Sequence, residues 1–88
     1  MKSKLIIDED GNKYWKLPNG DLHREDGPAI EYIDGDKYWY INGQSHREDG
    51  PAIEFNNSYK SWYLNNIRCT KKEYKYKMRF IKLNKLLK

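Results

Sequence analysis

The sequence predicts a mainly β fold: a single-layer antiparallel array of β-hairpins, with about six short strands, followed by one C-terminal α-helix. Three observations predict it. A nine-residue segment occurs twice without change, Asp-Gly and Asn-Gly pairs separate short runs of β-branched and aromatic residues, and near residue 70 the hydrophobic spacing becomes helical. We expect one domain, with residues 1–69 forming the repeat sheet and residues 70–88 a basic amphipathic helix belonging to it.

The repeat is visible in its copies. Residues 23–31, with the sequence His-Arg-Glu-Asp-Gly-Pro-Ala-Ile-Glu, recur as residues 46–54, and Trp15, Trp39 and Trp62 mark about three units of 23–24 residues. A repeat of this length indicates stacked supersecondary units, none of which can bury its apolar face alone.

Each unit is expected to be a β-hairpin. The runs 29–33 and 37–41 are rich in β-branched and aromatic residues and flank the Asp-Gly pair at 34–35. Asp-Gly and Asn-Gly pairs supply the positive φ angles of tight hairpin turns. In the third unit we expect the Asn pairs at 56–57 and 65–66 to replace them, because Asn tolerates the left-handed region.

Side-chain alternation along the strands predicts which residues share a face. The expected apolar, buried face consists of Trp15, Leu17, Ile30, Tyr32, Trp39, Ile41, Ile53, Phe55, Trp62 and Leu64. The expected outer face carries Tyr14, Tyr38, Tyr40 and Tyr63 with lysine and glutamate side chains, among them Glu31 and Glu54.

The last segment has the pattern of a capped helix. Thr70 and Glu73 form a capping box, in which each side chain bonds the backbone amide of the other residue. Two apolar stripes follow at helical spacing, one made of Tyr76, Phe80, Leu83 and Leu87, the other of Tyr74, Met78 and Ile81. We expect this helix to cover the end of the sheet or its apolar face and to protect the edge strand.

Composition and charge narrow the class of protein. The 88 residues are 34% charged and 15% aromatic, and their net charge of +4 is unevenly distributed. Residues 1–70 hold nine Lys/Arg against twelve Asp/Glu, a net of −3, whereas residues 71–88 hold eight against one, a net of +7. The lone Cys69 excludes an internal disulfide, and the early acidic residues 8–10 are unlike a signal peptide, so we expect a cytoplasmic protein.

The repeat resembles the MORN repeat, in the divergent form found in phage, giant-virus and antitoxin-like proteins. The segment from Trp39 to Ala52 fits the pattern Trp-Tyr-x-Asn-Gly-x-x-His-Arg-x-Asp-Gly-Pro-Ala, and the helix opened by Thr70 and Glu73 is typical of the same group. The resemblance covers roughly residues 4–76. It implies a single-layer hairpin array and supplies no catalytic residues.

Two identical polar clusters are candidate binding residues, namely His23, Arg24 and Asp26 in the first copy and His46, Arg47 and Asp49 in the second. Arginine offers phosphate a planar fork, so the clusters could bind a nucleotide. The favoured interpretation is structural: Asp satisfies turn amides, while Arg and His bridge neighbouring hairpins. Two equal copies also lack the asymmetric set of groups that catalysis needs. We therefore expect no enzyme.

Other ligands are less favoured. His23, His46 and Cys69 occupy equivalent positions, but intervals of 23 residues do not suit zinc, so we expect no metal and no cofactor. The acidic body disfavours nucleic acid except through the basic tail. Two apolar stripes on roughly opposite sides of the helix disfavour a membrane surface. Two open sheet edges leave a homodimer open.

The remaining interpretation is protein recognition. Tyr, Trp and Arg dominate interface hot spots, so Tyr38, Tyr40 and Tyr63 join the two polar clusters as candidate binding residues. The composition, rich in Lys, Asn, Ile and Tyr, suits a phage of a low-GC bacterium. By analogy with small phage-type proteins we expect an inhibitor of a host protein, with a defence component such as a CRISPR system as one candidate.

Overall fold

The computed structural model describes residues 2–87 and contains nine short strands and one helix. The strands are β1 (Lys4–Ile7), β2 (Lys13–Lys16), β3 (Ile30–Glu31), β4 (Lys37–Tyr38), β5 (Tyr40–Ile41), β6 (Gln44–Ser45), β7 (Ile53–Glu54), β8 (Lys60–Leu64) and β9 (Ile67–Cys69). The helix is α1 (Lys71–Leu86), which confirms the expected fold class.

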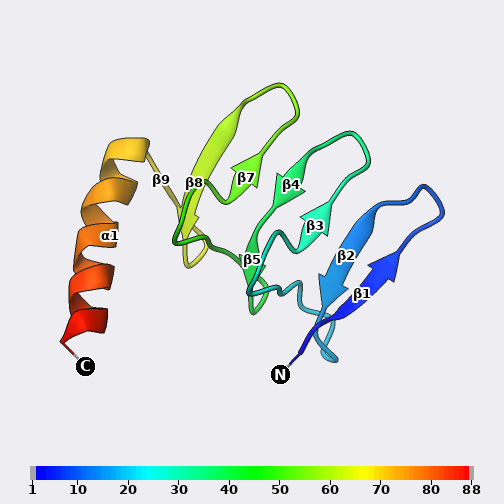
Figure 1. Ribbon diagram of the computed structural model, residues 1–88, viewed down its shortest axis with the longest axis horizontal. Helices are drawn as coiled ribbons and strands as arrows, with labels where there is room; N and C mark the ends of the chain where they lie inside the picture. The colour runs from blue at the N-terminus through cyan, green and yellow to red at the C-terminus, as the bar shows by residue number, and fades with distance from the viewer. Residues whose placement is uncertain (1, 88) are drawn as a thin grey trace.

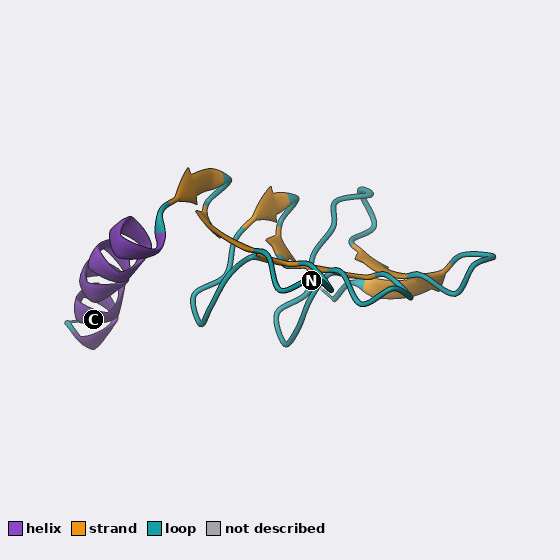
Figure 2. Ribbon diagram, turned by 90° about the horizontal axis from the view of Figure 1, so that it is seen from above, coloured by secondary structure: helices purple, strands orange, loops and turns teal. Residues whose placement is uncertain are grey.

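Seven strands form one antiparallel sheet in the order β1-β2-β3-β4-β7-β8-β9 (Figure 1). Strands β5 and β6 pair separately. The strand count is nine rather than about six because the chain also pairs on either side of the turns at Asn42-Gly43 and Asn65-Asn66. The molecule measures 44 × 33 × 17 Å. It is thin because the sheet is a single layer, and α1 lies at one end of that layer (Figure 2).

Most of the Gly and Asn residues in the repeats occupy turn positions with positive φ angles. Asn42 and Gly43 have φ angles of 51° and 77°, and Asn65 and Asn66 have 49° and 70°, as a type I′ hairpin requires at both central positions. The expectation for Asn56-Asn57 was wrong. The positive φ, 75°, is taken instead by Ser58. Ser58 lies 23 residues after Gly35, one repeat length, and therefore occupies the equivalent position of the turn.

The register corrects the assignment of faces. Residues directly opposite each other in antiparallel strands share a face, and two rows cross β2, β3, β4, β7 and β8. The first row is Tyr14, Ile30, Tyr38, Ile53 and Ser61; the second is Lys13, Glu31, Lys37, Glu54 and Lys60.

By alternation, Tyr32 and Phe55 belong to the first row's side, which we call the tyrosine face. The second side, with Trp15, Trp39 and Trp62, is the tryptophan face. Ile30, Tyr32, Ile53 and Phe55 were therefore placed on the wrong side of the sheet, and so were Glu31 and Glu54. The error arose from the register within the hairpins: Ile30 lies opposite Tyr38 and Ile53 opposite Ser61, so neither shares a face with the tryptophan that follows its partner.

Burial in this thin sheet is modest. Of the ten residues expected to be buried, only Ile30 and Leu64 are, at 7% and 5% exposure; the other eight are half-buried. The most buried apolar side chains are instead Ala29 and Ala52, both fully enclosed. A single layer leaves large side chains partly open to solvent on either face, so only small residues held against neighbouring backbone are fully covered.

The helix begins as expected. The Thr70 hydroxyl accepts a hydrogen bond from the Glu73 amide at 3.1 Å, and the Glu73 carboxylate accepts one from the Thr70 amide at 2.8 Å. Tyr74 and Met78 are buried against Leu64 and Cys69, with Trp62 and Ile81 packed beside them. The helix therefore covers the β8–β9 end of the sheet on its tryptophan face.

Candidate functional site

The arginine of each polar cluster lies between an indole ring and a glycine. Arg47 Cζ is 3.8 Å from the centroid of the Trp39 ring. Its Nε donates to Asp49 Oδ1 at 2.8 Å, and its Nη1 donates to Glu54 Oε2 at 2.8 Å and to the Pro51 carbonyl at 3.0 Å. Two carboxylates thus neutralise this half-buried guanidinium within its own repeat.

The first copy reproduces the arrangement. Arg24 Cζ lies 3.9 Å from the Trp15 centroid, and the guanidinium bonds Asp26 and Glu31 at 3.0 and 2.9 Å. A Cβ on Gly27 would come within 2.9 Å of Arg24 Cζ, so only glycine allows the guanidinium to pass this closely. The aspartates bond arginine here, whereas the sequence suggested that they would satisfy turn amides.

The histidines link neighbouring repeats. His23 Nδ1 accepts a hydrogen bond from the Asn42 amide at 2.9 Å, and His46 Nδ1 accepts one from the Asn65 amide at 2.9 Å. Each histidine therefore holds the turn that lies 19 residues further along the chain, as expected for a bridge between hairpins. Cys69 occupies the equivalent position in the third unit and is buried there.

These contacts predict the tautomer of both rings. A nitrogen that accepts from a backbone amide carries no proton, so the neutral His23 and His46 rings should carry their proton on Nε2. Long-range ¹H–¹⁵N spectra of the neutral rings should show the Nε2–H pattern for both residues in the folded protein. An Nδ1–H pattern for either ring would contradict the bridge.

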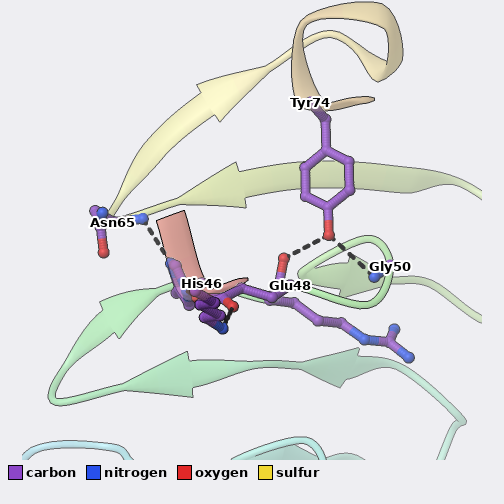
Figure 3. A network of polar contacts seen from close by, with 7 residues as sticks. His46, Glu48, Gly50, Asn65 and Tyr74 are labelled. Atoms are coloured by element: carbon purple, nitrogen blue, oxygen red, sulfur yellow. Dashed lines mark hydrogen bonds and ion pairs between the residues drawn. The ribbon is translucent and has the colours of Figure 1, made fainter. Parts of the chain in front are cut away.

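The second cluster also anchors the helix (Figure 3). The Tyr74 hydroxyl donates to the Arg47 carbonyl at 2.7 Å and accepts from the Gly50 amide at 3.1 Å. His46 Nε2 lies 2.9 Å from Glu48 Oε2, and Lys85 pairs with the same carboxylate. Hydrogen bonds from Lys85 and then His46 lower the pKa of Glu48, so the carboxylate remains charged and ties the last turn of α1 to the loop.

An open groove of about 900 Å³ lies between the two clusters and the helix on the tryptophan face. Its lining includes Arg24, Asp26, Arg47, Met78 and Lys82. Four acidic and four basic side chains line it, and both arginines already have carboxylate partners. The groove therefore presents little net positive charge to a phosphate.

The opposite side of the sheet carries a continuous row of aromatic rings, which we call the aromatic ladder. Its members are Tyr14, Tyr32, Tyr38, Phe55 and Tyr59, and successive ring centroids lie 6.2, 5.7, 5.9 and 5.6 Å apart. The first three contacts are edge-to-face and the last is stacked. Such pairs stabilise one another and form a rigid aromatic surface.

The remaining candidate tyrosines lie on the same side. Tyr40 follows Tyr38 by two residues, and burial, together with Tyr32 and Tyr63 nearby, raises the pKa of its hydroxyl. Burial also raises the pKa of Tyr38, so these hydroxyls stay protonated and can donate hydrogen bonds. Tyr38, Tyr40 and Tyr63 are thus brought together on the tyrosine face, while the two His-Arg-x-Asp clusters are not part of it.

The two ends of the ladder are held by polar groups. The Tyr14 hydroxyl donates to Asp8 Oδ2 at 3.2 Å, and Arg68 donates to the Tyr59 hydroxyl at 2.8 Å. The hairpin turns beside the ladder hold acidic residues, in the segments 8–10 and 34–36. This rim opposes a phosphate backbone and suits the polar edge of a protein interface.

Sequence reasoning missed three members of the ladder, Tyr32, Phe55 and Tyr59. It also missed the anchoring role of Tyr74. For Tyr32 and Phe55 the sequence did contain a signal. Each lies two residues beyond Ile30 or Ile53 in equivalent repeats, so each shares a face with that isoleucine. Finding the ladder required the strand register, which the turn lengths alone did not define.

Within residues 2–87, no group of three or more His, Cys, Asp and Glu side chains is arranged to hold a metal ion. Across the same residues no helix combines the length and the apolar character needed to cross a membrane. In comparisons with known proteins, no family model, no curated protein and no solved structure matches the chain.

Proposed function

We propose that this protein is a non-enzymatic binding module that recognises another protein through the aromatic ladder. The observation that supports this proposal is the ladder itself: five rings pack in a row on the face of the sheet opposite α1. Rigid aromatic side chains lose little conformational entropy on binding and dominate interface energetics. Tyr38, near the middle of the row, is the expected hot spot.

The partner we propose is a host protein that the chain inhibits, in keeping with its resemblance to phage-type repeat proteins. Two other functions have less support. A phosphorylated small molecule would have to compete with the carboxylates that already bond Arg24 and Arg47. Nucleic acid would have to bind through the basic tail, residues 71–88, because the sheet carries acidic turns and phosphates avoid negative surfaces.

Tyr38→Ala is expected to weaken partner binding by about 30-fold, because a central hot-spot residue contributes about 2 kcal/mol or more. The measurement is capture by the immobilised protein from a lysate of a low-GC bacterium, with quantitative mass spectrometry of the retained proteins. The matched control is Lys37→Ala, whose side chain points to the tryptophan face. Circular dichroism should show that both variants remain folded.

The proposal fails if the wild-type protein retains no partner in stoichiometric amount. It also fails if the folded Tyr38→Ala variant retains the partner as well as Lys37→Ala does.

A further inference from the structure

We infer that the outer side of α1 is a second docking surface, whose occupant is an acidic amphipathic helix of a partner protein. This inference concerns a surface separate from the aromatic ladder and does not depend on the proposed function. It starts from the fate of the two apolar stripes of α1. Tyr74, Met78 and Ile81 pack against the sheet, whereas the other stripe faces away from it.

The outward stripe is apolar and exposed. Its members are Tyr76, Phe80, Leu83 and Leu87, which are 60%, 52%, 51% and 76% exposed. The Tyr76 and Phe80 rings contact each other edge-to-face, with centroids 5.2 Å apart. Four large apolar side chains in one line on a helix are a surface that another apolar surface would stabilise.

The spacing of the stripe identifies the kind of occupant. Its intervals are four, three and four residues, which is the a/d pattern of a two-stranded coiled coil. We call these four residues the helix seam. Apart from Leu86 beside its last member, which is 82% exposed, the seam is a single line of side chains. Such a line suits one partner helix, whereas a helix that lies on a membrane presents a broader apolar face.

Charge defines the chemistry of that helix. In the heptad register, the positions that flank the seam hold three basic residues, Lys72, Lys77 and Arg79, followed near the C-terminal end by the uncharged Asn84 and Leu86. Glu73 is the one acidic residue between residues 71 and 88, against eight basic ones. A second copy of α1 would place basic flanks against basic flanks, which repel. Glutamates at the flanking positions of a partner helix would instead be attracted.

The helix is also prepared for binding. Its other side is fixed to the sheet by Tyr74, Met78 and the pair between Lys85 and Glu48, so the seam is already ordered before a partner arrives. An ordered surface loses less entropy on binding than a free peptide would.

The test uses the full chain and two synthetic peptides of about 21 residues, each with three heptads and Leu at every a and d position. One peptide has Glu at all e and g positions and the other has Lys. Fluorescence anisotropy should show binding of the Glu peptide, at least about tenfold weakening for the Lys peptide, and weakening of the Glu complex by added salt.

Leu83→Asp should weaken binding of the Glu peptide by at least about tenfold, because it places a charge in the seam. The matched control, Ile33→Asp, introduces the same charge at a residue that is 70% exposed on a hairpin far from α1, and should bind as the wild type does. Equal binding of both peptides, or full binding by folded Leu83→Asp, would overturn the inference. So would failure of the Glu peptide to bind.

Two further measurements decide between occupants. The seam would be assigned to a membrane if the wild-type protein floats with phosphatidylglycerol vesicles, Leu83→Asp abolishes this flotation, and the protein binds neither peptide. A wild-type dimer in light scattering that Leu83→Asp converts to a monomer would assign it to a second copy. Either result would overturn an acidic helix as the occupant. A wild-type monomer that binds the Glu peptide and not the vesicles supports it.

Discussion

Met78→Asp is expected to detach α1 from the sheet and to lower the free energy of unfolding by about 4 kcal/mol or more. Met78 is only 6% exposed and packs in the cluster that holds Leu64, Cys69 and Tyr74. An aspartate at this position would be a charge buried among apolar side chains, and the apolar contacts of Met78 would be lost. A penalty of this size is among the largest for single substitutions. Urea titration followed by circular dichroism measures it.

Leu83→Asp is the matched control for this substitution. It introduces the same side chain into the same helix, on a residue that is 51% exposed on the outward side. Exposed substitutions away from special contacts usually change stability by no more than about 0.5 kcal/mol. Equal destabilisation by the two variants would show that α1 is not held through Met78.

Arg47→Met should lower the free energy of unfolding by about 2–4 kcal/mol. The substitution keeps the apolar stem but removes the hydrogen bonds to Asp49, Glu54 and the Pro51 carbonyl and the contact with the Trp39 ring. It leaves the Glu54 carboxylate half-buried without its partner, which is the main source of the penalty. Thermal and urea unfolding provide the measurement.

Two comparisons sharpen this experiment. Arg47→Lys should recover little of the loss, since a single ammonium cannot match the planar fork that contacts three acceptors and an indole ring. Arg24→Met should cost less, at about 1–2 kcal/mol, because stability in a repeat stack depends on interfaces with neighbours and Arg24 lies nearer the end. Full stability of Arg47→Lys would contradict a role for the fork.

The sequence predicted the repeat unit, the hairpins and the capped helix because each depends on local chemistry. Asn42-Gly43 and the Thr70–Glu73 box are examples in which neighbouring residues determine the backbone. The faces of the sheet were assigned wrongly because they depend on register between strands of two to five residues. The links between Asp36 and Asn56, or His23 and Asn42, that fix this register join residues about 20 positions apart.

The candidate site was predicted only in part. The two His-Arg-x-Asp clusters were found as motifs, and their partners Glu31 and Glu54 were part of the same repeated segment. The ladder was incomplete in the sequence interpretation, because Tyr59 joins it only after the divergent turn at residues 56–58 returns the chain to the same face. The sequence also did not show which of the two helix stripes packs against the sheet. That depends on the hydrogen bond from Tyr74 to the backbone of the second cluster.

Each repeat places one indole ring under one cation: Trp15 under Arg24, Trp39 under Arg47, and Trp62 near Lys71. The chain therefore contains a separate spectroscopic reporter in every unit, at a contact that exists only while that unit is folded. Variants that retain a single tryptophan would allow fluorescence to follow the loss of structure unit by unit. The chain could thus show directly how many of its repeats unfold together.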